Sequence, residues 1–281
     1  MSTLPQPAAH GQRTWADPAR DKSGPRPERW AIKVEFDGTD YVGWQKQKSG
    51  LAIQQLIEEA ATQLSSGQPV PSITSGRTDS GVHAAGLVAH LDFPPGSNLT
   101  AHALAGALNY RLKPHPVVVL QAAPVSLSWN ARFSATWRRY RYSILNRRAR
   151  PALQARTMTH VPYPLDVSAM RAASQHLLGH HDFSSFRAAA CQARDALRTL
   201  DELTIHQEGD VIFMETQARS FLHHQVRNMV GTLVQVGRGR WHPDDVKRIL
   251  QARDRTQAGP TAPATGLCFM AVGYDEDPFA S

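Results

Sequence analysis

The segment Gly76-Arg77-Thr78-Asp79-Ser80-Gly81-Val82-His83 places an arginine and an aspartate between two glycines. Glycines free the backbone for a tight bend, and such a bend would present Arg77 and Asp79 where another molecule can approach closely. From the residues alone, Asp79 could equally form a turn or cap a helix. His83 could carry protons or be a hydrogen-bonded structural histidine.

Strand and helix patterns alternate on the N-terminal side and the C-terminal side of this segment. Ile32, Val34 and Phe36 alternate with charged residues, which is typical of a half-buried strand. In the first half we also expect a helix over residues 53–64, a second helix capped by Thr100 and ending at residue 112, and strands over residues 86–93 and 117–120.

The second half repeats the mixture. Tyr140, Tyr142 and Ile144 would share one face of a strand, because side chains alternate along strands. Further patterns predict a helix capped by Asp166, a hairpin over residues 203–214, a helix over residues 220–236 and a strand over residues 268–274.

Together the patterns predict an α+β fold. We expect two similar α/β lobes with antiparallel or mixed sheets flanking a central cleft. The N-terminal lobe, with the Asp79 loop, would comprise residues 30–125, and the C-terminal lobe residues 126–281.

Residues 1–29 contain five prolines among glycine, serine and mixed charges, and they show no strand or helix periodicity. This composition predicts a disordered tail, with order beginning at Trp30. An organellar transit peptide is the alternative, but Asp17, Asp21 and Glu28 weigh against it.

Basic residues outnumber acidic ones, giving a formal net charge of +7 and a pI of about 9.7. No Asp or Glu occurs from Phe93 to Leu165. We predict that this stretch contacts nucleic acid, and a solvated face is the alternative. Its basic residues are Arg111, Lys113, Arg132, Arg138, Arg139, Arg141, Arg147, Arg148, Arg150 and Arg156.

Cys191 and Cys268 are far apart and belong to no CxxC or His-rich arrangement, so the sequence suggests neither a zinc site nor a disulfide framework. Apolar runs are too short for a membrane span, and the N-terminus lacks the apolar core of a secretory signal. We expect a cytoplasmic protein that has no contact with membranes.

The segment 76–83 resembles the signature of the TruA family of tRNA pseudouridine synthases. Four further blocks resemble the family in the same order, and together they cover nearly everything from Trp30 to Tyr274. These blocks are residues 36–45, 131–142, 179–186 and 221–231.

The resemblance implies an isomerase that converts uridine to pseudouridine at positions 38, 39 and 40 of the anticodon stem-loop of tRNA. The bond from ribose to uracil N1 breaks and a bond to C5 forms, so no cofactor and no metal are expected. A homodimer is also implied, in which each tRNA touches both subunits.

The resemblance assigns three catalytic residues. Asp79 would be the catalytic carboxylate, and it must be ionised whether it adds covalently to the nucleotide or removes a sugar proton. Arg227 matches the family's basic partner, with a surface arginine as the alternative. Tyr140 matches the active-site tyrosine, whose ring could stack on uracil and whose hydroxyl could help remove the C5 proton, with core packing as the alternative.

The substrate-binding residues follow in the same way. Arg77 resembles the arginine that holds the target nucleotide out of the helix. Leu267 fits an apolar wall of the uracil pocket, although Cys268 stands where the family often carries an aromatic residue. Arg147 and Arg148 do not come from the resemblance; they belong to the acid-free stretch, whose charge leads us to expect that they contact tRNA.

Two other classes of function remain as alternatives. A tRNA-binding protein independent of catalysis would keep its effect when Asp79 is replaced by Asn. A nucleoside hydrolase would release free uracil, but the sequence lacks a calcium-type Asp cluster.

Overall fold

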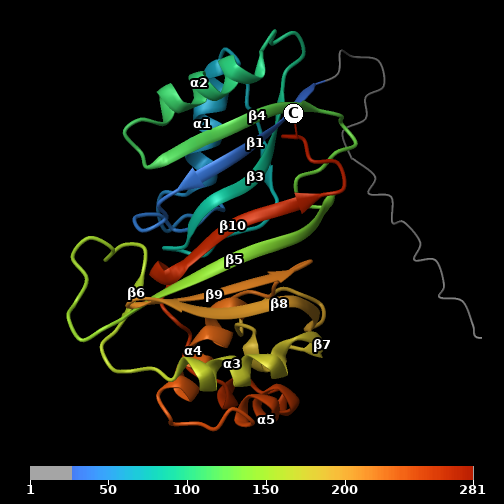
Figure 1. Ribbon diagram of the computed structural model, residues 1–281. Coiled ribbons are helices and arrows are strands. Elements are labelled where there is room, and N and C mark those ends of the chain that lie inside the picture. Colours follow the sequence, from blue (N-terminus) through green and yellow to red (C-terminus); the bar gives the residue numbers. More distant parts are fainter. Residues whose placement is uncertain (1–26, 281) are drawn as a thin grey trace, which may run out of the picture.

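The computed structural model describes residues 27–280, which contain ten strands and five α-helices (Figure 1). The strands are β1 (Glu28–Phe36), β2 (Ser72–Thr74), β3 (His83–Phe93), β4 (Val117–Val125), β5 (Ala135–Asn146), β6 (Thr159–Val161), β7 (Gly179–Asp182), β8 (Leu197–Glu208), β9 (Val211–Ala218) and β10 (Leu267–Tyr274). The helices are α1 (Ile53–Leu64), α2 (Ala101–Leu112), α3 (Val167–Ser174), α4 (Gln225–Gly237) and α5 (Asp245–Ala252).

One mixed sheet runs through the described part of the chain, in the order β4-β1-β3-β10-β5-β9-β8-β7, with β2 beside β3 and β6 beside β5. The last strand, β10, returns to the middle of this sheet. It pairs in parallel with β3 and antiparallel with β5. Strand β10 therefore joins the two halves of the chain through backbone hydrogen bonds.

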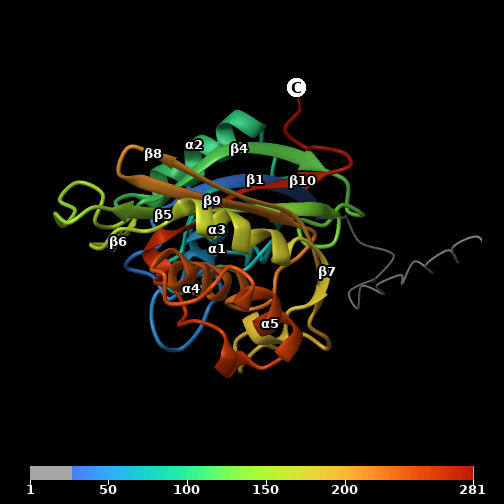
Figure 2. The ribbon, with the colours of Figure 1, turned by 60° about the horizontal axis from the view of Figure 1, so that its bottom comes forward.

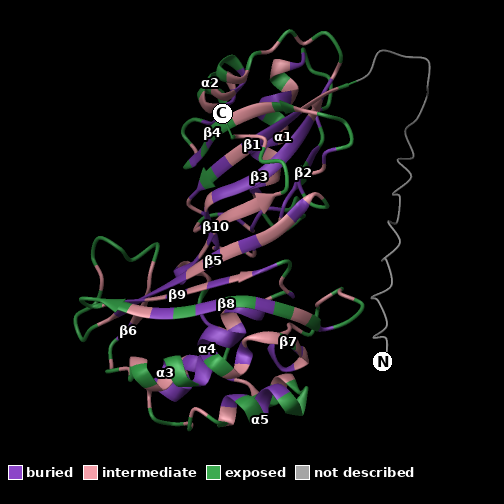
Figure 3. Cartoon of the chain, turned by 45° about the vertical axis from the view of Figure 1, so that its right-hand side comes forward, coloured by how far each residue is buried: buried purple, intermediate pink, exposed green. Residues whose placement is uncertain are grey.

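The helices cover one side of the sheet, where Figure 2 shows α1, α3 and α4. Their apolar faces pack on the strands in one large core, which Figure 3 shows as buried segments of β3, β5 and α4. A second, smaller cluster on the sheet comprises Ala31, Val88, Trp129 and Ala131. Helices on one face of a largely antiparallel sheet confirm the α+β class.

The face predicted for β5 is confirmed. Tyr142 and Ile144 are fully buried, and Tyr140 is 9% exposed. The predicted caps are also present, because the side chains of Thr100 and Asp166 accept hydrogen bonds from the backbone at the starts of α2 and α3.

The ordered chain starts earlier than predicted. Strand β1 begins at Glu28 rather than Trp30, because Arg29 is fixed by Asp92 across the sheet at 2.6 Å. Residues 1–26 of the predicted disordered tail lie outside the described part of the chain.

The helix predicted from Ser220 was wrong at its start. Helix α4 begins at Gln225, because His224 has left-handed backbone angles, φ 61° and ψ 5°, which end any helical run before it. The expected boundary near residue 125 coincides with the end of β4. The division into two lobes around a central cleft stays a prediction.

Candidate active site

Asp79 lies in the loop between β2 and β3, and a second loop over residues 37–52 supports it. The backbone N–H of Trp44 donates to the carbonyl of Thr78 at 3.2 Å, and the Ser80 hydroxyl donates to the carbonyl of Tyr41 at 3.1 Å. Gly43 makes this contact possible, because a Cβ there would lie 2.4 Å from the Thr78 oxygen and its φ of +101° favours glycine. The signature loop thus rests on a rigid backbone.

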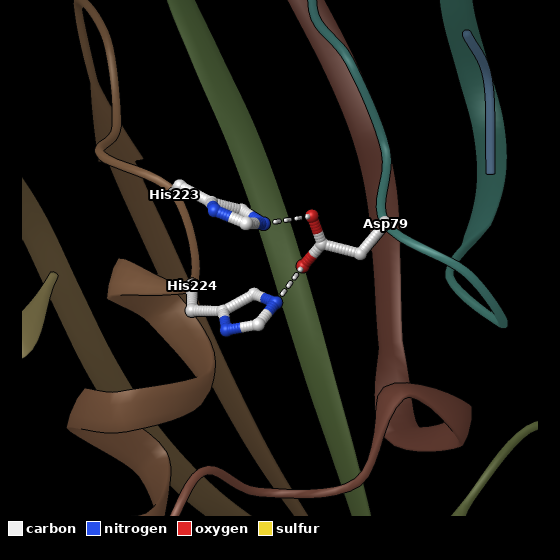
Figure 4. Close-up of side chains that lie close together, drawn as sticks. All are labelled: Asp79, His223 and His224. Atoms are coloured by element: carbon white, nitrogen blue, oxygen red, sulfur yellow. Dashed lines mark ion pairs between the residues drawn. The ribbon is translucent and has the colours of Figure 1, made fainter. Parts of the chain in front are cut away.

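Three basic side chains surround the carboxylate of Asp79. Its Oδ2 lies 3.3 Å from Nη1 of Arg227 and 3.3 Å from Nε2 of His224, while Oδ1 lies 3.3 Å from Nε2 of His223. Figure 4 shows both imidazole rings directed at the two carboxylate oxygens. The Asp79 side chain remains 24% exposed, so a ligand can still reach it.

Arg227 is held from both sides by the chain around it. Its Nε donates to the carbonyl of Ala262 at 2.7 Å, and the Ala262 N–H donates to the Arg227 carbonyl at 3.1 Å. One turn along α4, Gly231 admits the backbone of Pro260, whose oxygen would lie 1.7 Å from a Cβ. The guanidinium, with 15% of its side chain exposed, is therefore positioned by packing rather than free at the surface.

Burial lowers the pKa of His224, and the positive charges of Arg227 and Arg255 act in the same direction. The negative charge of Asp79 opposes this shift without overcoming it. His224 is therefore neutral at neutral pH, and Arg227 supplies the fixed positive charge beside Asp79.

Tyr140 on β5 packs between two phenylalanines. Its ring centroid lies 5.2 Å from Phe221 and 5.0 Å from Phe269, both in edge-to-face geometry. Burial raises the pKa of Tyr140 strongly, and the charge of Asp79 adds to the effect, so the hydroxyl is protonated at neutral pH. The tyrosine thus borders the site of Asp79 with its proton in place.

Several arginines of the acid-free stretch are paired with acidic residues, while its contact with nucleic acid stays a prediction. Acidic residues distant in sequence pair with four of its arginines in space. These pairs are Arg139 with Glu202, Arg141 with Glu215, Arg147 with Asp210, and Arg156 with Asp37 and Asp40.

Arg138 belongs to the stretch predicted to contact nucleic acid, but it is buried. It shares the inner face of β5 with Tyr140, is 8% exposed, and donates hydrogen bonds of 2.6–3.1 Å to the carbonyls of Ser75, Arg132, Ala135 and Arg219. It therefore ties the start of the Asp79 loop to the end of β9 and is not available to RNA. Arg148 and Arg150 remain exposed.

The other predicted positions are less uniform. Arg77 is exposed beside Asp79, whereas Leu267 is 5% exposed in the core, opposite Tyr142 in the sheet. His83 is buried, and its Nδ1 accepts from the Gly38 N–H at 3.1 Å, which favours the structural interpretation of this histidine.

Comparison with known proteins extends this description. The sequence profile of a family described as tRNA pseudouridine synthase matches residues 32–134 and 173–275. This chain belongs to the tRNA pseudouridine synthase family. The resemblance noted in the sequence is thereby confirmed.

Curated relatives of this tRNA pseudouridine synthase cover nearly its whole length. The tRNA pseudouridine synthase A of Gluconobacter oxydans (strain 621H) is 57% identical over 264 residues, 94% of this chain and 95% of that protein. That of Acidiphilium cryptum (strain JF-5) is 55% identical over 252 residues, 89% and 98% of the two chains. The protein is thus an isomerase that acts on tRNA.

Sequence reasoning about the synthase missed His223 and His224. The sequence feature that could have indicated them is a pair of histidines directly before an amphipathic helix. With the helix predicted to start at Ser220, both histidines would be helical, and their side chains would point about 100° apart. The donor atoms of Asp79, His223 and His224 lie within 4.8 Å of one another, a spacing that could hold a metal ion. Because the Arg227 guanidinium already lies 3.3 Å from the same carboxylate, it opposes a second cation there.

Within residues 27–280 of the synthase, no helix is both long and apolar enough to cross a membrane.

Proposed function

We propose that Asp79 is the catalytic carboxylate with which this synthase converts uridine to pseudouridine at positions 38, 39 and 40 of the tRNA anticodon stem-loop. The observation that carries the proposal is the contact of Asp79 Oδ2 with the guanidinium of Arg227, 148 residues away in the sequence. This contact joins a partly exposed carboxylate, whose charge also acts on Tyr140, to a fixed positive charge.

The chemistry requires a group that can act on ribose while the base turns. The N1–C1′ bond breaks, the C5–C1′ bond forms, C5 loses a proton and N1 gains one, so atoms and electrons balance without a cofactor. An ionised Asp79 could add to C1′ or remove a proton from C2′. The protonated Tyr140 hydroxyl can donate a hydrogen bond to the base and relay the C5 proton.

The same proposal assigns the substrate-binding residues. Arg77 is exposed two residues before Asp79, where it can enter the space left by a flipped nucleotide. Arg147 and Arg148 lie in the exposed segment after β5 and would contact tRNA phosphates. Leu267, which is 5% exposed, would form an apolar wall of the uracil pocket.

A homodimer, a cytoplasmic location and independence of any cofactor or metal complete the proposal. They derive from the family resemblance and from the chemistry of an isomerisation.

Tritium at uracil C5 of tRNA provides the test. The wild-type protein should release tritium to water without free uracil, while Asp79→Asn should reduce release by on the order of 10² or more and keep tRNA affinity. Undiminished tritium release by Asp79→Asn would refute the role of this carboxylate. Free uracil would instead indicate hydrolysis.

A further inference from the structure

The histidine pair before α4 has a backbone that requires an explanation. His224 adopts φ 61°, a left-handed conformation that is uncommon for residues other than glycine. Such strained residues persist where the surrounding structure fixes them, and they cluster at functional sites. The conformation therefore points to a functional role for the His224 side chain.

Hydrogen bonds fix the backbone on both sides of His224. The Leu222 N–H donates to Oε1 of the fully buried Gln225 at 2.8 Å, and the Gln225 N–H returns to the Leu222 carbonyl at 3.0 Å. The His223 carbonyl accepts from Ala188 at 2.9 Å. The turn is thus built into the protein rather than adopted by a loose loop.

The turn directs the side chains of two consecutive residues, His223 and His224, at the same carboxylate. In a strand or a helix, neighbouring residues point about 180° or 100° apart. Here the two imidazole rings lie with centroids 4.0 Å apart, and each directs its Nε2 at a different oxygen of Asp79 (Figure 4). The left-handed residue is the device that makes both contacts possible.

The two carboxylate oxygens are not equivalent. Oδ2 contacts both Arg227 and His224, whose side chains are 15% and 28% exposed. Oδ1 contacts only His223 among the basic groups described, and that side chain is 40% exposed. Oδ2 is therefore held by two of these side chains, whereas Oδ1 is held by one, the more exposed His223.

We propose that His224 and His223 are positioning residues for Asp79, with His224 and Arg227 anchoring Oδ2 so that Oδ1, which contacts His223, reacts with the target nucleotide. This inference deepens the proposed function and rests on it. Because Oδ2 has two basic contacts, it has fewer free lone pairs with which to attack the nucleotide. Fixing Oδ2 also fixes the direction in which Oδ1 points. Misplacing a reacting group by about 1 Å can cost on the order of 10² in rate.

The central experiment uses His224→Gly in the full-length protein. Glycine accepts the left-handed backbone without strain, so the melting temperature should not fall. The single-turnover rate at saturating tRNA should fall by on the order of 10², with tRNA affinity changed by less than about threefold. His224→Gln restores an amide near the position of Nε2 and should regain about tenfold of that rate.

Two further variants set the scale. His223→Ala should lose less rate than His224→Gly, because it removes the contact to the reacting oxygen and leaves the anchor. His242→Ala is the control, since His242 is 75% exposed and contacts Asp244 instead. It should match the wild type.

Three results would overturn the inference. They are a His224→Gly rate near that of the control, equal rates for the Gly and Gln variants, and a loss confined to tRNA affinity. The last result would make the pair an RNA contact. If Asp79→Asn is inactive while His224→Gly is fully active, the positioning role fails and the proposed function survives; an active Asp79→Asn would remove both.

Discussion

Replacing Arg138 by methionine should lower the free energy of unfolding, because Arg138 ties the start of the Asp79 loop to the core. Methionine fills a similar space and removes all donors, so the carbonyls of Ser75 and Ala135, which the guanidinium contacts inside the core, lose their partners. A buried carbonyl left unpaired costs about 1–3 kcal/mol, which gives roughly 2–6 kcal/mol for the pair. Water can replace the partner of the half-buried Arg132 and Arg219 carbonyls, so these add little.

The assay is urea unfolding followed by circular dichroism, with the free energy of unfolding taken from midpoint and slope. For a chain of this size the same loss corresponds to a fall in melting temperature of roughly 5–20 °C. Arg132→Met is the matched control, since that exposed side chain lies over the Phe133 ring, and it should change stability by less than about 0.5 kcal/mol. A loss below about 1 kcal/mol in Arg138→Met would refute the idea that this arginine organises the loop.

Three further predictions concern the site and its surroundings. Tyr140→Phe should retain its packing and melting temperature but lose tritium release by about 10² or more, and near-wild-type release would leave the tyrosine a packing residue. Gly231→Ala should lower stability by about 1–3 kcal/mol or more, because the added methyl overlaps the Pro260 oxygen, whereas Gly106→Ala, with nothing within 4 Å, should be neutral or stabilising; equal melting temperatures would contradict this. Arg148→Glu should weaken tRNA binding and reduce the salt slope by about one unit with little change in saturated rate, and an unchanged slope would remove it from the binding surface.

The sequence predicted those features that depend on residues close together in the chain. The alternation around Tyr140 predicted the buried face of β5, and the capping residues Thr100 and Asp166 predicted where α2 and α3 begin. Such patterns depend on strand and helix geometry alone, so they can be recognised without knowing the fold.

The sequence did not reveal the partners of the charged side chains. Arg138 belongs to the acid-free stretch, but in the structure it is buried. Its partners are carbonyls from segments as far away as Arg219. Likewise Arg141 pairs with Glu215, which lies directly opposite it only because β5 and β9 are neighbours. A gap in acidic residues along the chain says nothing about acids that arrive from other strands.

By itself, the sequence determined the α+β class, the family and the loop that contains Asp79, because these depend on local pattern and on motifs read in order. Only the tertiary structure decided what surrounds that carboxylate. Arg227 reaches it because Gly231 lets α4 approach residues 259–262, and His223 and His224 reach it because one left-handed residue turns both rings the same way. Contacts between residues more than 140 positions apart depend on how elements pack, and no local pattern encodes that.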